Sequence, residues 1–150
     1  MDFYNSFEAG DVRKDLITSS CIDNAGKTIS LLNNNNTKLF KYLPDPVAAG
    51  ALDGNDIPEI RYADILHSRA EAFNELTGPN QPALDLINKV RRRAKLSNKL
   101  LADFPTKELF RNHILKEQVL EFYSESQRRK GLIRMDRFVS SDIARGKTNA

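Results

Sequence analysis

Hydrophobic residues recur at helical spacing along two neighbouring stretches of the chain, residues 60–77 and 82–95. On a helical wheel of about 100° per residue, the apolar residues of the first stretch share one face: Tyr62, Ile65, Leu66, Phe73 and Leu76. Asp64, His67 and Glu71 lie on the opposite, polar face. The second stretch carries a stripe formed by Leu84, Ile87 and Val90. The pattern predicts two amphipathic helices whose apolar faces need cover.

A short turn separates these two stretches. Gly78 suits a helix C-terminus, because glycine adopts the left-handed conformation without a Cβ penalty. Pro79 cannot continue the first helix, and Pro82 suits the first turn of the second. We therefore expect an antiparallel helical hairpin over residues 60–95, about as long as a tetratricopeptide unit of roughly 34 residues.

Residues 106–138 predict a third long helix followed by a turn. Thr106 is a suitable N-cap, and Glu108 lies in the first turn, where the helix dipole favours a negative charge. We expect this helix to run to about Arg129 and to be broken at Gly131, with a further helical turn after it. The polar tail, residues 139–150, is expected to fray.

The N-terminal third, residues 1–59, predicts irregular structure. Its prolines and glycines interrupt regular elements: Pro44, Pro46, Gly50, Gly54 and Pro58. Two short alternating stretches, Thr28–Leu31 and Leu39–Tyr42, are compatible with a small β-hairpin across the polar run Asn33–Asn36. The expected fold is mainly α: a tetratricopeptide-like helical hairpin plus a third long helix, in a single partial domain of residues 1–150.

Glutamates spaced by four residues mark the third helix. Glu117, Glu121 and Glu125 form one stripe beside Phe110 and Ile114. The stripe is compatible with a carboxylate site, but like charges in a row repel unless they are neutralised. We favour a structural ion-pair network, since partly shielded carboxylates are tolerated when they are paired. The candidate members are Arg61, Glu71, Arg91, Arg93, Glu117, Glu121, Glu125 and Arg128.

Other chemistries receive little support from the residues. His67–Glu71 and His113–Glu117 have a spacing that can ligate metal, but the Glu-x-x-His spacing of di-metal bundles is absent. We expect these side chains to be solvated or salt-bridged. The sole cysteine, Cys21, allows no intrachain disulfide.

Neither nucleic-acid binding nor catalysis is expected. The net charge is only +3, and the arginines at 91–93 point in three directions without interleaved aromatics. No glycine-rich phosphate loop exists, and no serine or cysteine has a convincing base beside it. We therefore expect no enzyme, no metal and no cofactor. Without tryptophan, the chain is poorly equipped to form a complete glycan site.

Five motifs in order resemble the SusD/RagB family. They are Asp11-Val12-Arg13, Lys41-Tyr42, the Ile-Arg-Tyr-Ala-Asp-Ile-Leu of residues 60–66, the Ala-Glu-Ala-Phe-Asn-Glu of residues 70–75, and the Ile-Asn-Lys-Val-Arg-Arg-Arg-Ala of residues 87–94. In the third helix, further residues fall in register with the family: Glu117, Glu121, Phe122, Glu125, Arg128, Leu132 and Arg134. The chain departs from the pattern at Gln118, Ser126 and Gly131. The resemblance is to the C-terminal portion of the family and covers residues 3–138.

The resemblance implies a nutrient-binding lipoprotein on the extracellular face of the Bacteroidetes outer membrane. Such a protein captures an oligosaccharide or other nutrient without catalysis, as the partner of a SusC-like TonB-dependent transporter. This chain would then be a scaffold fragment of a longer exported parent, whose signal peptide and lipidated cysteine it lacks. The ligand would be held by loops elsewhere in that parent, so the ligand-binding residues are unknown. The alternative is a tetratricopeptide-like adaptor that binds a protein or peptide, in which case Met1 would be a genuine cytosolic start.

Overall fold

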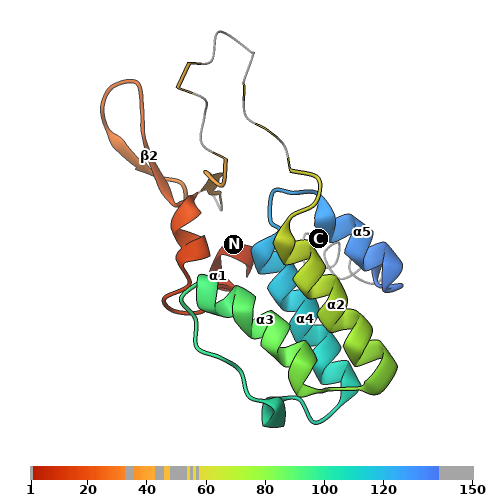
Figure 1. Ribbon diagram of the computed structural model, residues 1–150. Helices are drawn as coiled ribbons and strands as arrows, with labels where there is room; N and C mark the ends of the chain where they lie inside the picture. The colour runs from red at the N-terminus through yellow and green to blue at the C-terminus, as the bar shows by residue number, and fades with distance from the viewer. Residues whose placement is uncertain are drawn as a thin grey trace.

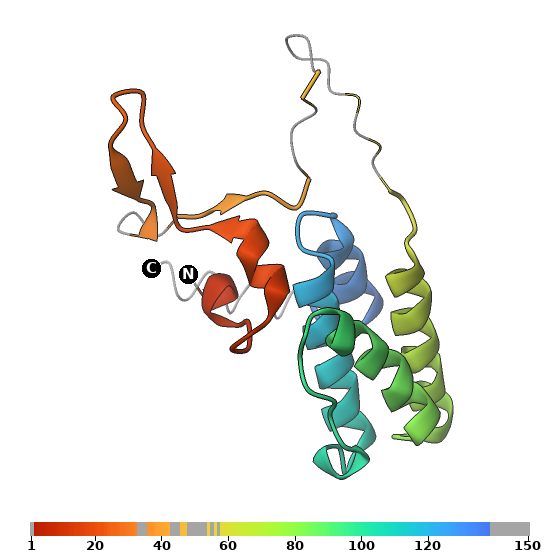
Figure 2. The same cartoon turned by 60° about the vertical axis from the view of Figure 1, so that its left-hand side comes forward.

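The computed structural model describes residues 2–32, 36–42, 46–47, 54, 56 and 58–138. The described chain is mainly helical and carries two small antiparallel sheets near its N-terminus, which confirms the predicted fold class. Helices α2, α3 and α4 lie side by side, α5 leaves the end of α4, and the N-terminal segment (residues 2–32 and 36–42) packs at one side (Figures 1 and 2). The elements are α1 (Asp2–Asn5), a 3-10 helix (Val12–Leu16), β1 (Ile17–Thr18), β2 (Ser20–Ile22), β3 (Thr28–Ser30), β4 (Lys38–Leu39), α2 (Tyr62–Thr77), α3 (Gln81–Arg93), a second 3-10 helix (Leu101–Asp103), α4 (Lys107–Glu121) and α5 (Gln127–Arg134).

Local hydrogen bonds set the ends of the helical hairpin α2–α3. The backbone N–H of Arg61 donates to the Asp64 carboxylate at 2.7 Å, which satisfies one free donor at the start of α2. Gly78 adopts a φ of 76° at the end of α2, and its N–H donates to the Asn74 carbonyl. The Asn80 side chain then accepts from the Ala83 N–H at 2.9 Å and caps α3. The structure thus forms the predicted hairpin, with both helices inside residues 60–95.

The main core lies between α2, α3 and α4. Ala70 and Ala83 are fully buried and leave room for the helices to approach closely. The aromatic rings of Phe104 and Phe110 pack with centroids 5.0 Å apart. The buried members of this core are Ala70, Ala83, Leu84, Ile87, Phe104, Phe110 and Ile114.

The predicted buried face of α2 was right for Leu66 and in part for Phe73, but wrong for its other three residues. The buried residues are Ala63, Leu66, His67, Ala70, Glu71 and Asn74. Tyr62, Ile65 and Leu76 are instead 69%, 54% and 82% exposed. The wheel ranks faces by side-chain hydrophobicity, but the buried face combines small alanines with polar groups that find partners in other elements. Asn74, for example, donates to the Lys107 carbonyl at 3.1 Å.

The predicted third helix is two helices. Helix α4 ends at Glu121, and Ser124 and Ser126 then adopt left-handed conformations with φ of 63° and 57°. This turn redirects the chain into α5, whose Leu132 is buried. Gly131 lies inside α5 and does not break the helix, contrary to prediction.

The N-terminal segment contains a small hairpin, but its strands differ from the predicted pair. Strand β3 pairs with β2, and β4 pairs with β1. The β2–β3 turn is favoured locally, because the Asp23 carboxylate accepts from the N–H groups of Ala25 and Lys27, and Gly26 has a φ of 80°. The hairpin projects away from the helices (Figures 1 and 2). Asn33–Asn35 and the tail 139–150 lie outside the described residues.

A second apolar cluster attaches the N-terminal segment to the end of α4. Phe7, Ile17, Leu120 and Tyr123 are buried together, with Phe3 partly buried against them. The ring of Phe7 meets that of Tyr123 edge-on at 6.0 Å. The Tyr123 hydroxyl donates to the Arg13 carbonyl at 3.0 Å. Residues more than 100 positions apart are thereby held at one junction.

Candidate functional site

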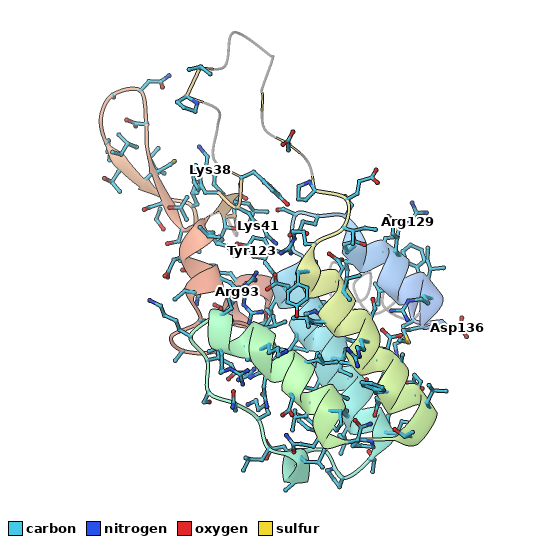
Figure 3. The ribbon with its side chains drawn as sticks, viewed as in Figure 1. Lys38, Lys41, Arg93, Tyr123, Arg129 and Asp136 are labelled. Carbon is cyan, nitrogen blue, oxygen red and sulfur yellow. The ribbon has the colours of Figure 1, made fainter. Side chains whose placement is uncertain are left out.

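A cluster of ion pairs fills the junction between the N-terminal segment and α2, α3 and α4. We call it the ion cluster. Its members are Glu8, Asp11, Arg13, Lys41, Arg61, Arg91, Arg93, Glu117, Glu121 and Glu125. Figure 3 shows Lys41, Arg93 and Tyr123 close together at this junction.

The deepest part of the ion cluster surrounds Glu117, which is fully buried. Arg91, also fully buried, donates through Nη1 to Glu117 and through Nη1 and Nη2 to Glu8 at 2.9 and 3.0 Å. Arg13 approaches Glu117 from the N-terminal segment at 3.3 Å. The same guanidinium is held by Asp11, with hydrogen bonds of 2.9 and 2.6 Å. Two arginines from distant segments therefore share one carboxylate.

The outer part of the ion cluster surrounds Glu121 and Glu125. Arg61 donates to Glu121 at 3.0 Å and to both carboxylate oxygens of Glu125 at 2.9 and 2.8 Å. Arg93 adds hydrogen bonds to Glu121, and Lys41 forms an ion pair with Glu125. The Lys41 ammonium also lies 4.6 Å from the centre of the Tyr123 ring.

Two carboxylates of this cluster, Glu8 and Glu121, are stabilised in their ionised forms. Hydrogen bonding by Arg91 lowers the pKa of Glu8 to about 2. Burial opposes ionisation of Glu121, but hydrogen bonds and charges of Arg93 and Arg61 outweigh it and leave its pKa below the usual value. A general acid or base works best with a pKa near the operating pH. The pKa values of Glu8 and Glu121 lie below the ordinary range for a carboxyl and therefore far from neutral pH, which favours a structural role over a catalytic one.

The eight predicted ion-pair candidates fall into three groups. Six meet in the ion cluster: Arg61, Arg91, Arg93, Glu117, Glu121 and Glu125. Glu71 is buried elsewhere on α2 and pairs with Arg134 of α5, with one contact at 2.7 Å. Arg128 is exposed on α5 and lines an apolar pocket.

Sequence reasoning did not assign Glu8, Asp11, Arg13 and Lys41 to the network. The available signal was the motif resemblance: Asp11-Val12-Arg13 and Lys41-Tyr42 stood out as family-like in a segment without periodicity. In the structure, Arg13 connects the first motif to Glu117 of α4, and Lys41 connects the second to Glu125 in the turn after α4.

Neither histidine is solvated or salt-bridged, contrary to expectation. His67 is 1% exposed, and its Nδ1 lies 2.9 Å from the Ala63 carbonyl. His113 stacks on Phe104 with centroids 4.7 Å apart. Burial lowers the pKa of both rings, that of His113 to about 4. In the described part of the chain, no group of three or more His, Cys, Asp or Glu side chains could hold a metal ion.

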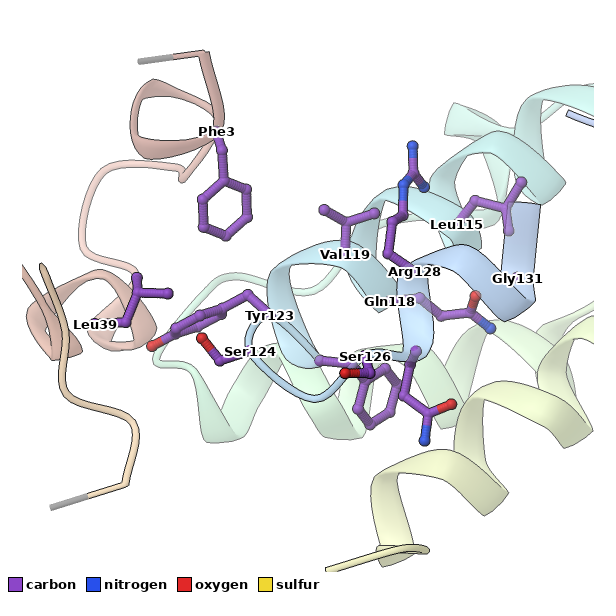
Figure 4. Close-up of a pocket in the computed structure, with 12 residues that line it drawn as sticks. Phe3, Leu39, Leu115, Gln118, Val119, Tyr123, Ser124, Ser126, Arg128 and Gly131 are labelled. Atoms are coloured by element: carbon purple, nitrogen blue, oxygen red, sulfur yellow. The ribbon is translucent and has the colours of Figure 1, made fainter. Parts of the chain in front are cut away.

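An apolar pocket of about 390 Å³ lies beside the ion cluster. Phe3 and Leu39 of the N-terminal segment face Val119 of α4 and Gly131 of α5 across it (Figure 4). Its polar side chains come from α4, from the α4–α5 turn and from the start of α5. The lining residues are Phe3, Leu39, Leu115, Gln118, Val119, Phe122, Tyr123, Ser124, Ser126, Gln127, Arg128 and Gly131. The pocket suits an apolar group with few hydrogen bonds.

Comparison with known proteins agrees with the motifs. The sequence model of the SusD family matches residues 8–150, so the chain belongs to the SusD family. This confirms the resemblance to SusD/RagB proteins. The chain is also similar to SusD-like protein P38 of Formosa agariphila, with 32% identity over 95 residues that make up 59% of this chain and 19% of that protein. The match thus spans about a fifth of the relative's length. No solved structure matches the chain significantly.

A helix that crosses a membrane must be long and apolar. None of the helices in the described ranges is both long and apolar enough to cross a bilayer.

Proposed function

We propose that the chain is the helical scaffold of a SusD-type protein that captures a nutrient, such as a glycan, at the cell surface without catalysis. The observation that carries this proposal is the family match over residues 8–150. The partner is a SusC-like TonB-dependent transporter, and the location is the extracellular face of the outer membrane, where the parent protein is held as a lipoprotein. These finer points rest on the family resemblance.

The described residues support a scaffold role. The ion cluster ties four segments together through arginine–carboxylate pairs, and the pKa values of Glu8 and Glu121 are lowered by their arginine partners. We propose that this cluster is a structural joint. Sugar binding normally uses exposed aromatic surfaces together with polar side chains. At the ion cluster, the Tyr123 ring is buried against Phe7, and its hydroxyl is already bonded to the Arg13 carbonyl.

Calorimetric titration with a panel of neutral and anionic oligosaccharides tests the proposal. We expect the complete polypeptide encoded by the reading frame around this chain to bind one member with micromolar affinity. Residues 1–150 alone, shown to be folded by circular dichroism, should give no measurable heat. Micromolar binding by residues 1–150 alone would show that the chain itself carries the glycan site. Absence of binding by either protein would reject nutrient capture from this panel as the function.

A transporter partnership requires a separate measurement. The complete polypeptide should co-purify with an outer-membrane β-barrel transporter from its native membrane, after mild detergent extraction. Recovery of the polypeptide without any such partner would count against that part of the proposal.

A further inference from the structure

Helix α2 carries a second apolar stripe on its outer side. The steps between Tyr62, Ile65, Arg69, Phe73 and Leu76 are three or four residues, so these side chains share one face of the helix. We call these five residues the outer stripe. At a rise of about 1.5 Å per residue, it is roughly 21 Å long. Tyr62, Ile65 and Leu76 are more than half exposed, whereas Phe73 is partly buried against the core.

Most of the outer stripe lies outside the buried face of α2, and only Phe73 also packs against the core. The inner face, with Ala63 and Ala70, packs in the core. A polar strip formed by Asp64, Ser68 and Glu75 separates it from the outer stripe on one side. A helix that needed only solvent outside its buried face would carry polar residues over the whole remainder. Two apolar faces indicate a helix that packs on two sides.

Arg69 lies at the centre of the outer stripe. Its guanidinium carbon is 5.2 Å from the centre of the Phe73 ring. Among the described residues, no carboxylate forms an ion pair with Arg69. A cation on an apolar surface that becomes covered needs an opposite charge on the covering surface.

A second copy of this chain would fit the outer stripe poorly. In a two-fold symmetric dimer, the same patch meets itself. Two antiparallel copies of α2 centred on the outer stripe would bring Arg69 against Arg69, because residue 69 is the midpoint between residues 62 and 76. Like charges placed opposite each other disfavour such a contact.

The length of SusD-like protein P38 indicates what covers the outer stripe. The match spans 19% of the related SusD-like protein, so most of that polypeptide has no counterpart in these residues. A tetratricopeptide-like hairpin is one unit of a stack, and such units bury their apolar faces against neighbouring units. We infer that the outer stripe docks an amphipathic helix from the remainder of a longer SusD-family polypeptide, and that this helix places a carboxylate opposite Arg69.

Cysteine labelling tests this inference without any glycan, so its outcome is independent of the nutrient-binding experiment. Ile65→Cys and Leu76→Cys are made separately in a Cys21→Ser background, and Ser68→Cys on the polar strip serves as the matched control. Each variant is produced as residues 1–150 and as the complete polypeptide of the reading frame. Maleimide labelling rates are then compared.

We expect labelling at positions 65 and 76 to be at least about tenfold slower in the complete polypeptide than in residues 1–150, because a docked helix must open first. The rate at position 68 should be the same in both. Arg69→Glu should lower the melting temperature of the complete polypeptide by more than that of residues 1–150, in which only the contact of Arg69 with the Phe73 ring is lost.

Three results would overturn the inference. Equal labelling of positions 65 and 76 in both proteins would show that nothing covers the outer stripe. Protection already present in a dimeric form of residues 1–150, with the mass measured by light scattering, would assign the surface to a second copy. A reading frame that encodes no residues beyond these 150 would remove the proposed occupant.

Discussion

At the scale of single residues, Glu121 is the carboxylate on which the outer part of the ion cluster converges. It is 2% exposed, accepts from Arg61 and Arg93, and lies 3.7 Å from Arg13. Glu121→Gln would remove the carboxylate that pairs with Arg93, and one of the carboxylates that pair with Arg61 and Arg13. We expect a loss of about 3 kcal/mol in the free energy of unfolding, the lower end for breaking a buried pair, because the Arg93 side chain is 58% exposed. Urea denaturation followed by circular dichroism measures it.

Glu108→Gln provides the matched control for this substitution. Glu108 also pairs with two arginines, Arg111 and Arg137, but its side chain is 55% exposed. Exposed pairs contribute roughly 0–1 kcal/mol, so its loss should be much smaller. If Glu121→Gln also costs less than about 0.5 kcal/mol, the structural-joint role of the ion cluster should be abandoned.

The buried histidines predict a loss of stability in mild acid. Burial lowers the pKa of His113 from 6.5 to about 4; the charges of Arg91 and Lys99 lower it further, and those of Glu117 and Glu8 oppose the shift. Between these values the unfolded chain binds the proton and the folded chain does not, so stability falls as the pH decreases from about 6.5 to about 4. The free energy of unfolding then changes with pH, and each histidine that stays neutral in the folded chain contributes at most about 1.4 kcal/mol per pH unit to that slope.

His113→Phe should reduce the acid slope and retain the ring contact with Phe104. Urea denaturation at a series of pH values between 4 and 7 measures the effect. The remaining slope is expected from His67, whose pKa is also lowered by burial, and below about pH 5 from carboxylates such as Glu8 and Glu121, whose pKa values are lowered by their arginine partners. A slope identical to that of the unsubstituted chain would mean that His113 does not carry this linkage.

The sequence identified part of the candidate site at this scale. The spacing of Glu117, Glu121 and Glu125 marked the acidic stripe, and the requirement for counter-charges pointed to Arg91 and Arg93. Arg13 and Lys41 were not assigned, because periodicity describes only neighbours along one helix. These cations lie more than 80 positions before the carboxylates they approach.

At the scale of elements, the turn between α4 and α5 depends on two left-handed serines. Ser126 has a φ of 57° and makes no side-chain capping bond to α5. Glycine adopts this conformation without the Cβ penalty, so Ser126→Gly should leave stability unchanged or raise it by about 0.5–1 kcal/mol. Ser126→Val should lower it by about 1–2 kcal/mol, because a β-branched residue is strained there. Thermal and urea denaturation measure both changes.

Ser68→Gly is the control for the effect of glycine itself. Ser68 is exposed in the interior of α2, where glycine should destabilise by about 0.5 kcal/mol. The same substitution thus has opposite expected signs at the two positions. Equal destabilisation at both would show that the left-handed conformation of Ser126 is not a source of strain.

The elements differ in how far the sequence predicts them. Helices α2 and α3 follow from periodicity and from the breakers Gly78 and Pro79. The end of α4 was missed because residues 122–126 contain neither glycine nor proline. The buried face of α2 was also misassigned, since its Ala63 and Ala70 contribute little to a hydrophobic wheel but are the residues that allow close packing.

At the scale of the whole molecule, the N-terminal segment and the helices meet at one junction. The N-terminal segment consists of short strands and a hairpin that projects from the rest of the molecule (Figure 2). Its buried residues Phe7 and Ile17 pack together with Leu120 and Tyr123 from the end of α4 and the turn after it. Its attachment relies on the aromatic contacts around Phe7 and on the ion pairs of Arg13 and Lys41. Regions with few buried contacts open at lower free energy than the rest of a protein. We therefore expect the segment to open before the helices unfold.

Phe7→Ala tests this order of opening. Phe7 is buried, with its ring 5.1 Å from Phe3 and 6.0 Å from Tyr123, so truncation should cost about 3 kcal/mol. Hydrogen exchange should accelerate at the amides of β1 and β4, while the amides in the middle of α3 keep their protection. Phe40→Ala, at a ring that is 39% exposed, should change little. Equal loss of protection in β1, β4 and α3 would instead mean that the N-terminal segment and the helices unfold as one cooperative unit.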